Sequence, residues 1–235
     1  MVTGPKVEIA GRFGKREIIS TFNTLEQVVK ALKSNDAEFA SAEHIAQARI
    51  ANPGLSHSVN VSGSWTANAF VYDCEKAYVV TPEFNPILNH LKEATAAYIQ
   101  NKNLAVSEKE FARIVKAAKA DEGRSNPARR RVLIMENQNY DIPVPGLSKD
   151  PLAKFRFRET TPKYAKSLQK SGVEEVPVWL IEPKYFKGEK LPIAREEWLH
   201  AAHGELPANS CIDGYVGGAN GWHSNGTAYG VRSLA

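Results

Sequence analysis

The sequence predicts an α+β protein, and three observations lead to that prediction. Apolar runs typical of buried strands occur at residues 77–80 (AYVV), 132–135 (VLIM) and 176–181 (VPVWLI). Elsewhere, apolar residues recur every three or four positions, as on one face of an amphipathic helix. The stretch after Gly204 is rich in glycine and has no helical periodicity, so we expect loops and short strands there.

Length and composition limit the classes of protein. The chain has 235 residues, of which 43% are hydrophobic, 9% aromatic and 24% charged. This is enough for one large domain or two small ones with a packed core. It excludes a disordered chain, a collagen-like fibre and a disulfide-stapled miniprotein. A net charge of +4 is too small by itself to predict a nucleic-acid partner.

The cysteines and the hydropathy of the chain predict its cellular compartment. Cys74 and Cys211 lie far apart and outside any CxxC or Cys/His cluster, which excludes a zinc ribbon and a redox motif. Two free thiols in a reducing compartment are favoured over one long-range disulfide. The N-terminus lacks the apolar core of a secretory signal, and no run of about 18 apolar residues occurs. We therefore expect a soluble, cytoplasmic protein without a membrane span.

Residues 1–75 are predicted to form a smaller α/β extension that packs on the main domain or mediates assembly. The expected elements are strands at 7–9 and 17–21 around the turn GRFGK, a helix over 25–33 capped by Thr24, a helix over 41–50 stopped by Asn52-Pro53-Gly54, and a strand or loop over 56–66.

Residues 76–235 are predicted to form the main domain. After the strand at 77–80 we expect a helix over 86–99, a helix opened by the capping box of Ser107 and Glu110, a strand ending at Glu136, a weak helix near 164–169 and the strand at 176–181. We interpret the basic run 124–131 as a solvated loop rather than a phosphate-binding site, because Pro127 lies within it and a strand follows it.

The most specific segment is KLPIAREEWLHAAHG at residues 190–204. Pro192 would suit the first turn of a helix and Gly204 its left-handed cap, so the segment predicts a helix. Its alanines would let the helix approach a neighbouring backbone closely, while Trp198 fills the remaining space.

This segment resembles the signature LP-x-x-x-EW-x-x-AA-x-G of the formylglycine-generating-enzyme type of C-type lectin fold. Two further segments resemble that family in the same order, VSEKEFARIVKA (106–117) and the strand at 176–181, and GVR (230–232) resembles its closing strand. The resemblance covers roughly residues 76–235. It implies a C-type lectin-like domain over these residues.

The same resemblance bears on catalysis. The formylglycine-generating enzymes need two nearby cysteines for copper, whereas only Cys211 lies in the matching region. An enzyme of this fold remains the alternative, as an oxidase or a metal-assisted hydrolase that uses His200, His203 or Cys211. His200 and His203, three residues apart, also suit a structural role, because cationic or polar tips are favourable in the last turn of the predicted helix. We expect no cofactor and no metal.

The C-terminal segment IDGYVGGANGWHSNGTAYG (212–230) resembles the variable region in the variable proteins of diversity-generating retroelements. In that family, randomised adenines turn Asn-type codons into codons for small polar or aromatic residues, and tryptophan is not reachable from them. The resemblance therefore implies that Trp222 is fixed. It places the variable region at about residues 205–235.

Tyrosine, serine, glycine and asparagine are also typical of antibody-like binding loops, independently of any resemblance. The residues that we expect to contact a ligand are Asn209, Ser210, Asp213, Tyr215, Asn220, His223, Asn225, Thr227 and Tyr229. Four residues are expected to support the scaffold: Trp179, Trp198, Trp222 and Arg232.

The leading hypothesis is a non-enzymatic ligand-binding protein with a diversified C-terminal surface. Its expected partner is a protein or another macromolecule but not a nucleic acid, and no membrane span is expected. Two other readings stay open. The glycines could form tight turns without a binding role, and residues 1–75 could serve assembly in an oligomer whose size the sequence does not fix.

Overall fold

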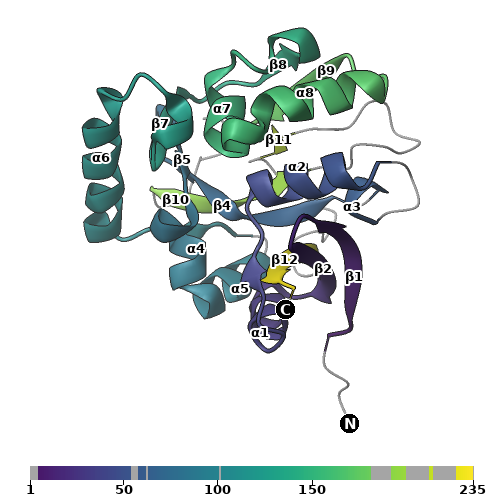
Figure 1. The fold of residues 1–235 in the computed structure, drawn as a ribbon. Coiled ribbons are helices and arrows are strands. Elements are labelled where there is room, and N and C mark those ends of the chain that lie inside the picture. The colour runs from purple at the N-terminus through teal and green to yellow at the C-terminus, as the bar shows by residue number, and fades with distance from the viewer. Residues whose placement is uncertain are drawn as a thin grey trace.

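Strand β4 (Ser64–Tyr72) is the centre of the fold, since all nine of its residues are buried. The computed structural model describes residues 5–53, 58–61, 63–100, 102–180, 192–199, 212–213 and 226–234. Within them, the strands join one mixed sheet in the order β1-β2-β12-β4-β10-β11-β9-β8, and β5 and β7 extend it from β4. Figure 1 shows how the helices cover this sheet.

The first half of the chain supplies these elements: β1 (Val7–Phe13), β2 (Arg16–Asn23), α1 (Leu25–Lys33), β3 (Glu38–Phe39), α2 (Ala42–Ala51), α3 (Ser58–Val61), β4, β5 (Lys76–Val80), the 3₁₀ turn η1 (Pro82–Phe84), α4 (Pro86–Asn89), α5 (Leu91–Ile99), β6 (Leu104–Ala105) and α6 (Glu108–Glu122). The second half supplies η2 (Pro127–Arg129), β7 (Val132–Glu136), β8 (Tyr140–Pro143), η3 (Val144–Gly146), α7 (Pro151–Phe157), η4 (Arg158–Thr160), α8 (Thr161–Lys170), β9 (Glu175–Trp179), β10 (Ile193–Leu199), β11 (Ile212–Asp213) and β12 (Gly226–Ser233).

The sheet separates two hydrophobic clusters because successive side chains of a strand point to opposite faces. In β4, Phe70 and Tyr72 belong to the cluster under α2, α7 and α8, whereas Ala69 and Val71 belong to the cluster under α1, α4, α5 and α6. In Figure 1, α2, α7 and α8 accordingly lie on one side of β4, and α1, α4 and α5 lie on the other.

Much of the predicted secondary structure is confirmed. The N-terminal hairpin turns at Gly14, whose φ of +55° suits glycine. Helices α1 and α2 begin after Thr24 and Ser41, although Thr24 makes no side-chain cap hydrogen bond. Helix α6 begins after Ser107, which accepts a hydrogen bond from the Glu110 backbone N–H at 3.3 Å. The expected strands correspond to β5, β7 and β9.

The helix predicted over residues 190–204 is wrong for the described part of that segment. Residues 193–199 form β10, which pairs with β4, β6 and β11. The side chains of Ile193 and Ala194 are buried in the two opposite clusters, so the segment is covered on both faces. Sheet pairing along its length overrides the helix propensity of its alanines and glutamates.

Three further predictions need correction. The helix expected over 86–99 breaks at His90, which has φ −129° and ψ 48°, into α4 and α5. The segment expected as a strand or loop over 56–66 contains α3 and only the start of the longer β4. Between residues 137 and 173 the sequence predicts only a weak helix near 164–169. The structure has that helix, α8, and also β8 and α7.

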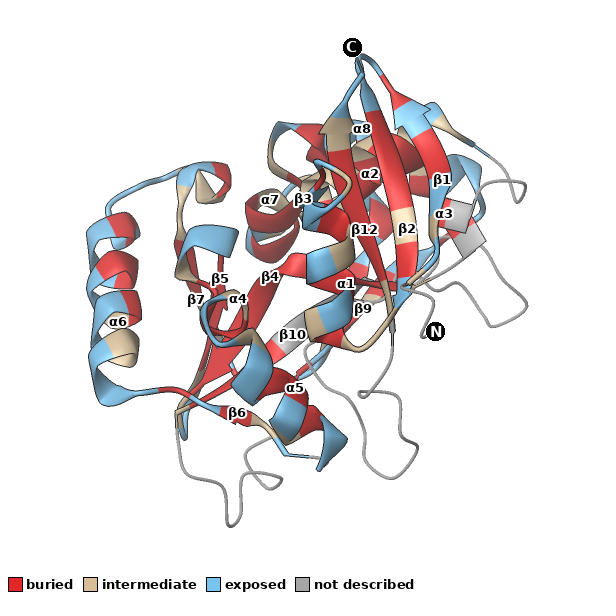
Figure 2. Cartoon of the chain, turned by 90° about the horizontal axis from the view of Figure 1, so that it is seen from below, coloured by how far each residue is buried: buried red, intermediate tan, exposed pale blue. Residues whose placement is uncertain are grey.

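The predicted boundary between residues 75 and 76 falls in the turn between β4 and β5. These strands pair in antiparallel register, with Tyr72 opposite Ala77. The N-terminal strand β2 also pairs along the length of β12, from Asn23 opposite Gly226 to Arg16 opposite Ser233. Figure 2 shows β2, β12 and β4 side by side and largely buried. Residues before 76 therefore contribute strands to the same sheet as the C-terminal strand.

Gly230 in β12 is required by close packing. A Cβ atom there would lie 2.6 Å from Leu32 Cδ2, 2.9 Å from Ala37 Cβ and 3.3 Å from the Glu38 carbonyl oxygen. We expect Gly230→Ala to lower the free energy of unfolding by about 1–3 kcal/mol, because α1 and β3 must shift. Urea denaturation of both proteins measures the difference. The matched control is Gly146→Ala, since a Cβ at Gly146 meets nothing within 4 Å. Equal stability of both variants would contradict this packing.

Candidate ligand-binding surface

The structure describes part of the predicted contact set. Thr227 and Tyr229 lie in β12, and Asp213 lies in β11. The remaining predicted contacts lie outside the described residues: Asn209, Ser210, Tyr215, Asn220, His223 and Asn225. Of the predicted scaffold residues, Trp222 also lies outside them.

A row of paired strand residues places Asp213 at the same level of the sheet as Ala228, whereas Thr227, the neighbour of Ala228, points to the opposite face. Ala228 pairs with Trp65, Trp65 with Trp198, Trp198 with Asp213, and Asp213 with Trp179. Thr227, next to Ala228, pairs with Phe22 on the other side of β12. The row therefore crosses β2, β12, β4, β10, β11 and β9 at one level of the sheet.

Both ends of the C-terminal segment between Leu199 and Gly226 are attached to the sheet at this level. Strand β10 ends at Leu199, which pairs with Ser64, and β12 begins at Gly226, two residues before the partner of Trp65. Both strands therefore flank the start of β4. Since neighbouring strands lie about 4.8 Å apart, their backbones are about 10 Å apart there. The described ends of this segment, Leu199 and Gly226, thus lie next to the first residues of β4, and β11 within the segment pairs with β10 and β9.

Tyr229 is not a contact residue. Its side chain is fully buried, at 0% exposure, in the cluster under α2, α7 and α8. Its carbonyl oxygen accepts a hydrogen bond from the Ala40 N–H at 2.8 Å. The prediction that Tyr229 meets a ligand is therefore wrong. Thr227 and Tyr229 are two residues apart in β12 and therefore point to the same face of the strand. Thr227 is half-buried at the start of the strand, whereas Tyr229 lies further along, where this face is covered by the core.

Two exposed aromatic residues lie at this level of the sheet and were not among the predicted contacts. Phe22, opposite Thr227, is 62% exposed, and Trp179, opposite Asp213, is 44% exposed. Exposed aromatic side chains are enriched where proteins bind each other. The sequence marks Phe22 only as the end of a strand, and Trp179 was expected to be a scaffold residue. Only the register of the sheet places them beside Thr227 and Asp213.

Arg232 links two neighbouring strands, β12 and β2, through Glu17. Its guanidinium donates to Glu17 Oε2 from Nη2 at 2.6 Å and from Nε at 3.0 Å. Glu17 is opposite Arg232 in β12 and opposite Arg12 in β1, so two arginines flank its buried side chain. The hydrogen bond from Arg232 holds the pKa of Glu17 below its usual value, although burial opposes this effect. The pair fixes β12 to β2.

The residues proposed for the enzymatic alternative lie outside the described chain: His200, His203 and Cys211. Cys74 is exposed in the turn between β4 and β5. Among the described residues, no group of three or more His, Cys, Asp or Glu side chains is placed to hold a metal ion. No helix in this part of the chain has the length and apolar character needed to cross a bilayer.

Comparison with known proteins identifies the fold. No family model matches the sequence, and no curated protein sequence matches it. A solved structure described as "Accommodation of massive sequence variation in Nanoarchaeota by the C-type lectin fold" superimposes with a TM-score of 0.59. The two chains are 13% identical, and the match covers 94% of this chain and 100% of the other. The chain has the C-type lectin fold.

Proposed function

We propose that this chain, which has the C-type lectin fold, is a non-enzymatic binding protein that displays a diversified C-terminal surface. In this proposal it is the variable protein of a diversity-generating retroelement, and its scaffold is of the formylglycine-generating-enzyme type. The single observation that carries the proposal is the anchoring of the segment between Leu199 and Gly226. Both ends join the central strands, so residues between them other than β11, which pairs with β10 and β9, can change without altering the described sheet.

The chemistry of that segment supports a binding role. Small polar residues and tyrosine adapt their hydrogen bonds and offer contact area at low entropic cost. The proposed contacts are Asn209, Ser210, Asp213, Tyr215, Asn220, His223, Asn225 and Thr227, joined by Phe22 and Trp179 from the framework. The proposed ligand is a protein or another macromolecule, recognised by shape and hydrogen bonding. The similar solved structure, described as accommodating massive sequence variation on this fold, also supports the proposal.

Sequencing the last codons of this gene from many cells of its source population tests diversification. We expect substitutions clustered between residues 205 and 227. Trp222, Tyr229, Gly230 and Arg232 should stay constant, because the last three hold β12 in the sheet. A uniform C-terminal sequence, or substitutions that fall equally on residues 229–232, would overturn the proposal.

Binding through the framework aromatics is a separate prediction. A display library randomised at the proposed contacts outside the described residues should yield binders to a small globular protein such as lysozyme. In such a binder, Phe22→Ser should weaken affinity about tenfold, which corresponds to about 1.4 kcal/mol, by removing an aromatic contact beside Thr227. Surface plasmon resonance measures the change.

The control for this variant is Ile99→Ser. Ile99 is 60% exposed at the end of α5, and the strand that follows it, β6, pairs with the other end of β10 at Ile193. This control should leave affinity unchanged. Equal losses in Phe22→Ser and Ile99→Ser would show that Phe22 acts through general surface effects and does not contact the ligand.

A further inference from the structure

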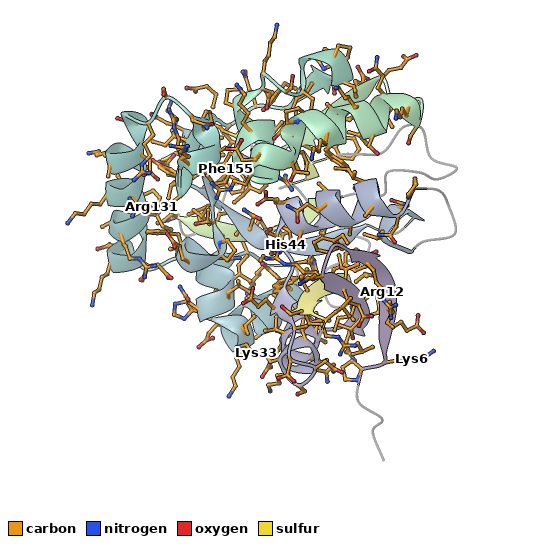
Figure 3. All side chains as sticks on the ribbon, in the orientation of Figure 1. Lys6, Arg12, Lys33, His44, Arg131 and Phe155 are labelled. Carbon is orange, nitrogen blue, oxygen red and sulfur yellow. The ribbon has the colours of Figure 1, made fainter. Side chains whose placement is uncertain are left out.

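A cavity of about 670 Å³ lies between α1, the start of α2, η1 and the loop that precedes β7. This volume is within the range of small-molecule sites. Every described residue that lines it falls between Val29 and Arg158, so β10, β11 and β12 take no part in it. Figure 3 labels Lys33, His44 and Arg131, which come from three separate parts of the chain that meet here.

Cationic side chains outnumber carboxylates around the cavity. Six lining residues are cationic: Lys33, Arg129, Arg130, Arg131, Arg156 and Arg158. Three are acidic: Glu38, Glu43 and Glu83. Arg131 also meets Asp121 outside the cavity, at 3.3 Å from Nη2 to Oδ1. The lining therefore carries more cationic than acidic side chains.

The loop that carries three of these arginines is fixed in place. Arg158 Nη1 donates to the carbonyl oxygens of Ala128 and, at 3.1 Å, Arg130. Arg130 Nη2 donates to the Arg124 carbonyl oxygen at 2.8 Å. Arg129 is exposed, and among the described residues its guanidinium has no hydrogen-bond or ion-pair partner. A positive group is thus held at the mouth of the cavity without a fixed counter-charge.

Backbone strain marks the residue that ties this loop down. Arg158 has φ +52° and ψ −136°, a conformation that favours glycine. Holding a residue with a side chain there costs about 1–3 kcal/mol, and such strain clusters at functional sites. The strained backbone lies where the Arg158 guanidinium reaches two carbonyls of the arginine loop. The strained residue is therefore the one whose guanidinium holds the arginine loop at the cavity.

The rest of the lining is mixed, with polar side chains at Ser41, Asn68 and Thr81 and an apolar part. Val29, Leu32, Phe39, Pro82 and Leu88 give the cavity hydrophobic walls. Burial also raises the pKa of Glu43 and lowers the pKa of His44, and Arg16 beside His44 lowers it further. Both shifts favour the neutral forms of these side chains.

We propose that this cavity binds a small organic phosphate monoester with an apolar or aromatic body. A phosphate monoester carries about −1.5 to −2 charges near pH 7, which suits a lining in which cationic side chains outnumber carboxylates. Guanidinium groups suit phosphate because they donate paired hydrogen bonds in one plane. The apolar walls would take the organic group of the ester. This site is separate from the proposed diversified surface and does not depend on it.

Isothermal titration calorimetry of the full chain with phenyl phosphate tests the site. We expect saturable binding, weaker binding of inorganic phosphate because it lacks the apolar group, and weaker binding of benzoate because it carries one charge. Arg129→Ser combined with Lys33→Ser should weaken phenyl phosphate binding at least tenfold. Both side chains lie at the cavity, and neither makes an ion pair with a described residue.

The matched control is Lys166→Ser combined with Lys170→Ser on α8, which removes the same charge from an exposed helix face. It should leave phenyl phosphate binding unchanged. Absence of saturable binding, or equal losses in the control and the cavity variant, would overturn the proposal. Inorganic phosphate or benzoate binding as tightly as phenyl phosphate would overturn the proposed ligand class.

Discussion

Arg232→Ala is expected to lower the free energy of unfolding by about 3 kcal/mol, because it leaves the buried Glu17 carboxylate without its main partner. The Glu17 side chain is 3% exposed and accepts two hydrogen bonds from Arg232. Chemical denaturation of the wild-type and variant proteins at neutral pH measures the loss.

The size of this loss should depend on pH. The hydrogen bond from Arg232 lowers the folded-state pKa of Glu17 below its unfolded value of about 4.3. This contribution to stability is therefore complete above the unfolded pKa and is lost as the pH falls through the folded pKa. The difference between the wild-type and variant proteins should shrink in acid over that range.

Arg12→Ala provides the matched control. Arg12 also contacts Glu17, at 3.1 Å from Nε to Oε1, but its side chain is 63% exposed. Exposed ion pairs contribute about 0–1 kcal/mol, so this variant should lose far less stability. If Arg12→Ala cost as much as Arg232→Ala, the role assigned to the β2–β12 ion pair would be wrong.

Tyr229→Ala is expected to be at least as damaging, with a loss of about 3–5 kcal/mol, because it removes a large aromatic side chain from the core. Tyr229 is fully buried on the face of β12 that packs under α2, α7 and α8. The variant leaves a cavity that the surrounding strands cannot fill. Thermal and urea denaturation measure the loss.

Thr227→Ala tests whether Thr227, in contrast to the buried Tyr229, contributes little to stability. Thr227 lies two residues before Tyr229, is half-buried and belongs to the proposed contact set. We expect this variant to change stability by less than about 1 kcal/mol. A stable Tyr229→Ala protein would contradict the burial of Tyr229 and return that residue to the contact set.

Local patterns in the sequence predict most of the elements that carry their own signals. The apolar spacing of 25–33 and the serines at 41 and 107 define α1, α2 and α6 because caps and periodicity are local properties. Helix α7 also carries a signal that was missed. Asp150 caps it by accepting from the Ala153 N–H at 2.8 Å, and Pro151 follows at its first position.

Sheet membership could not be predicted in the same way. The segment 190–204 has helical composition, and only its pairing with β4, β6 and β11 makes residues 193–199 a strand. The burial of Tyr229 has the same cause. Alternation along one strand does not show where that strand enters the core, because this depends on partners such as β2 and β4. Phe22 was missed for this reason too.

The position of β12 has a consequence for how errors in the gene would be filtered. This strand follows the proposed variable segment in the chain, yet it lies inside the sheet, between β2 and β4. A stop codon or a frameshift in the variable segment would delete or scramble β12, and with it Tyr229, Gly230 and Arg232. Such a product could not complete its sheet and would be removed by proteolysis. Folding itself would thus act as a reading-frame check, so that only full-length variants would be displayed.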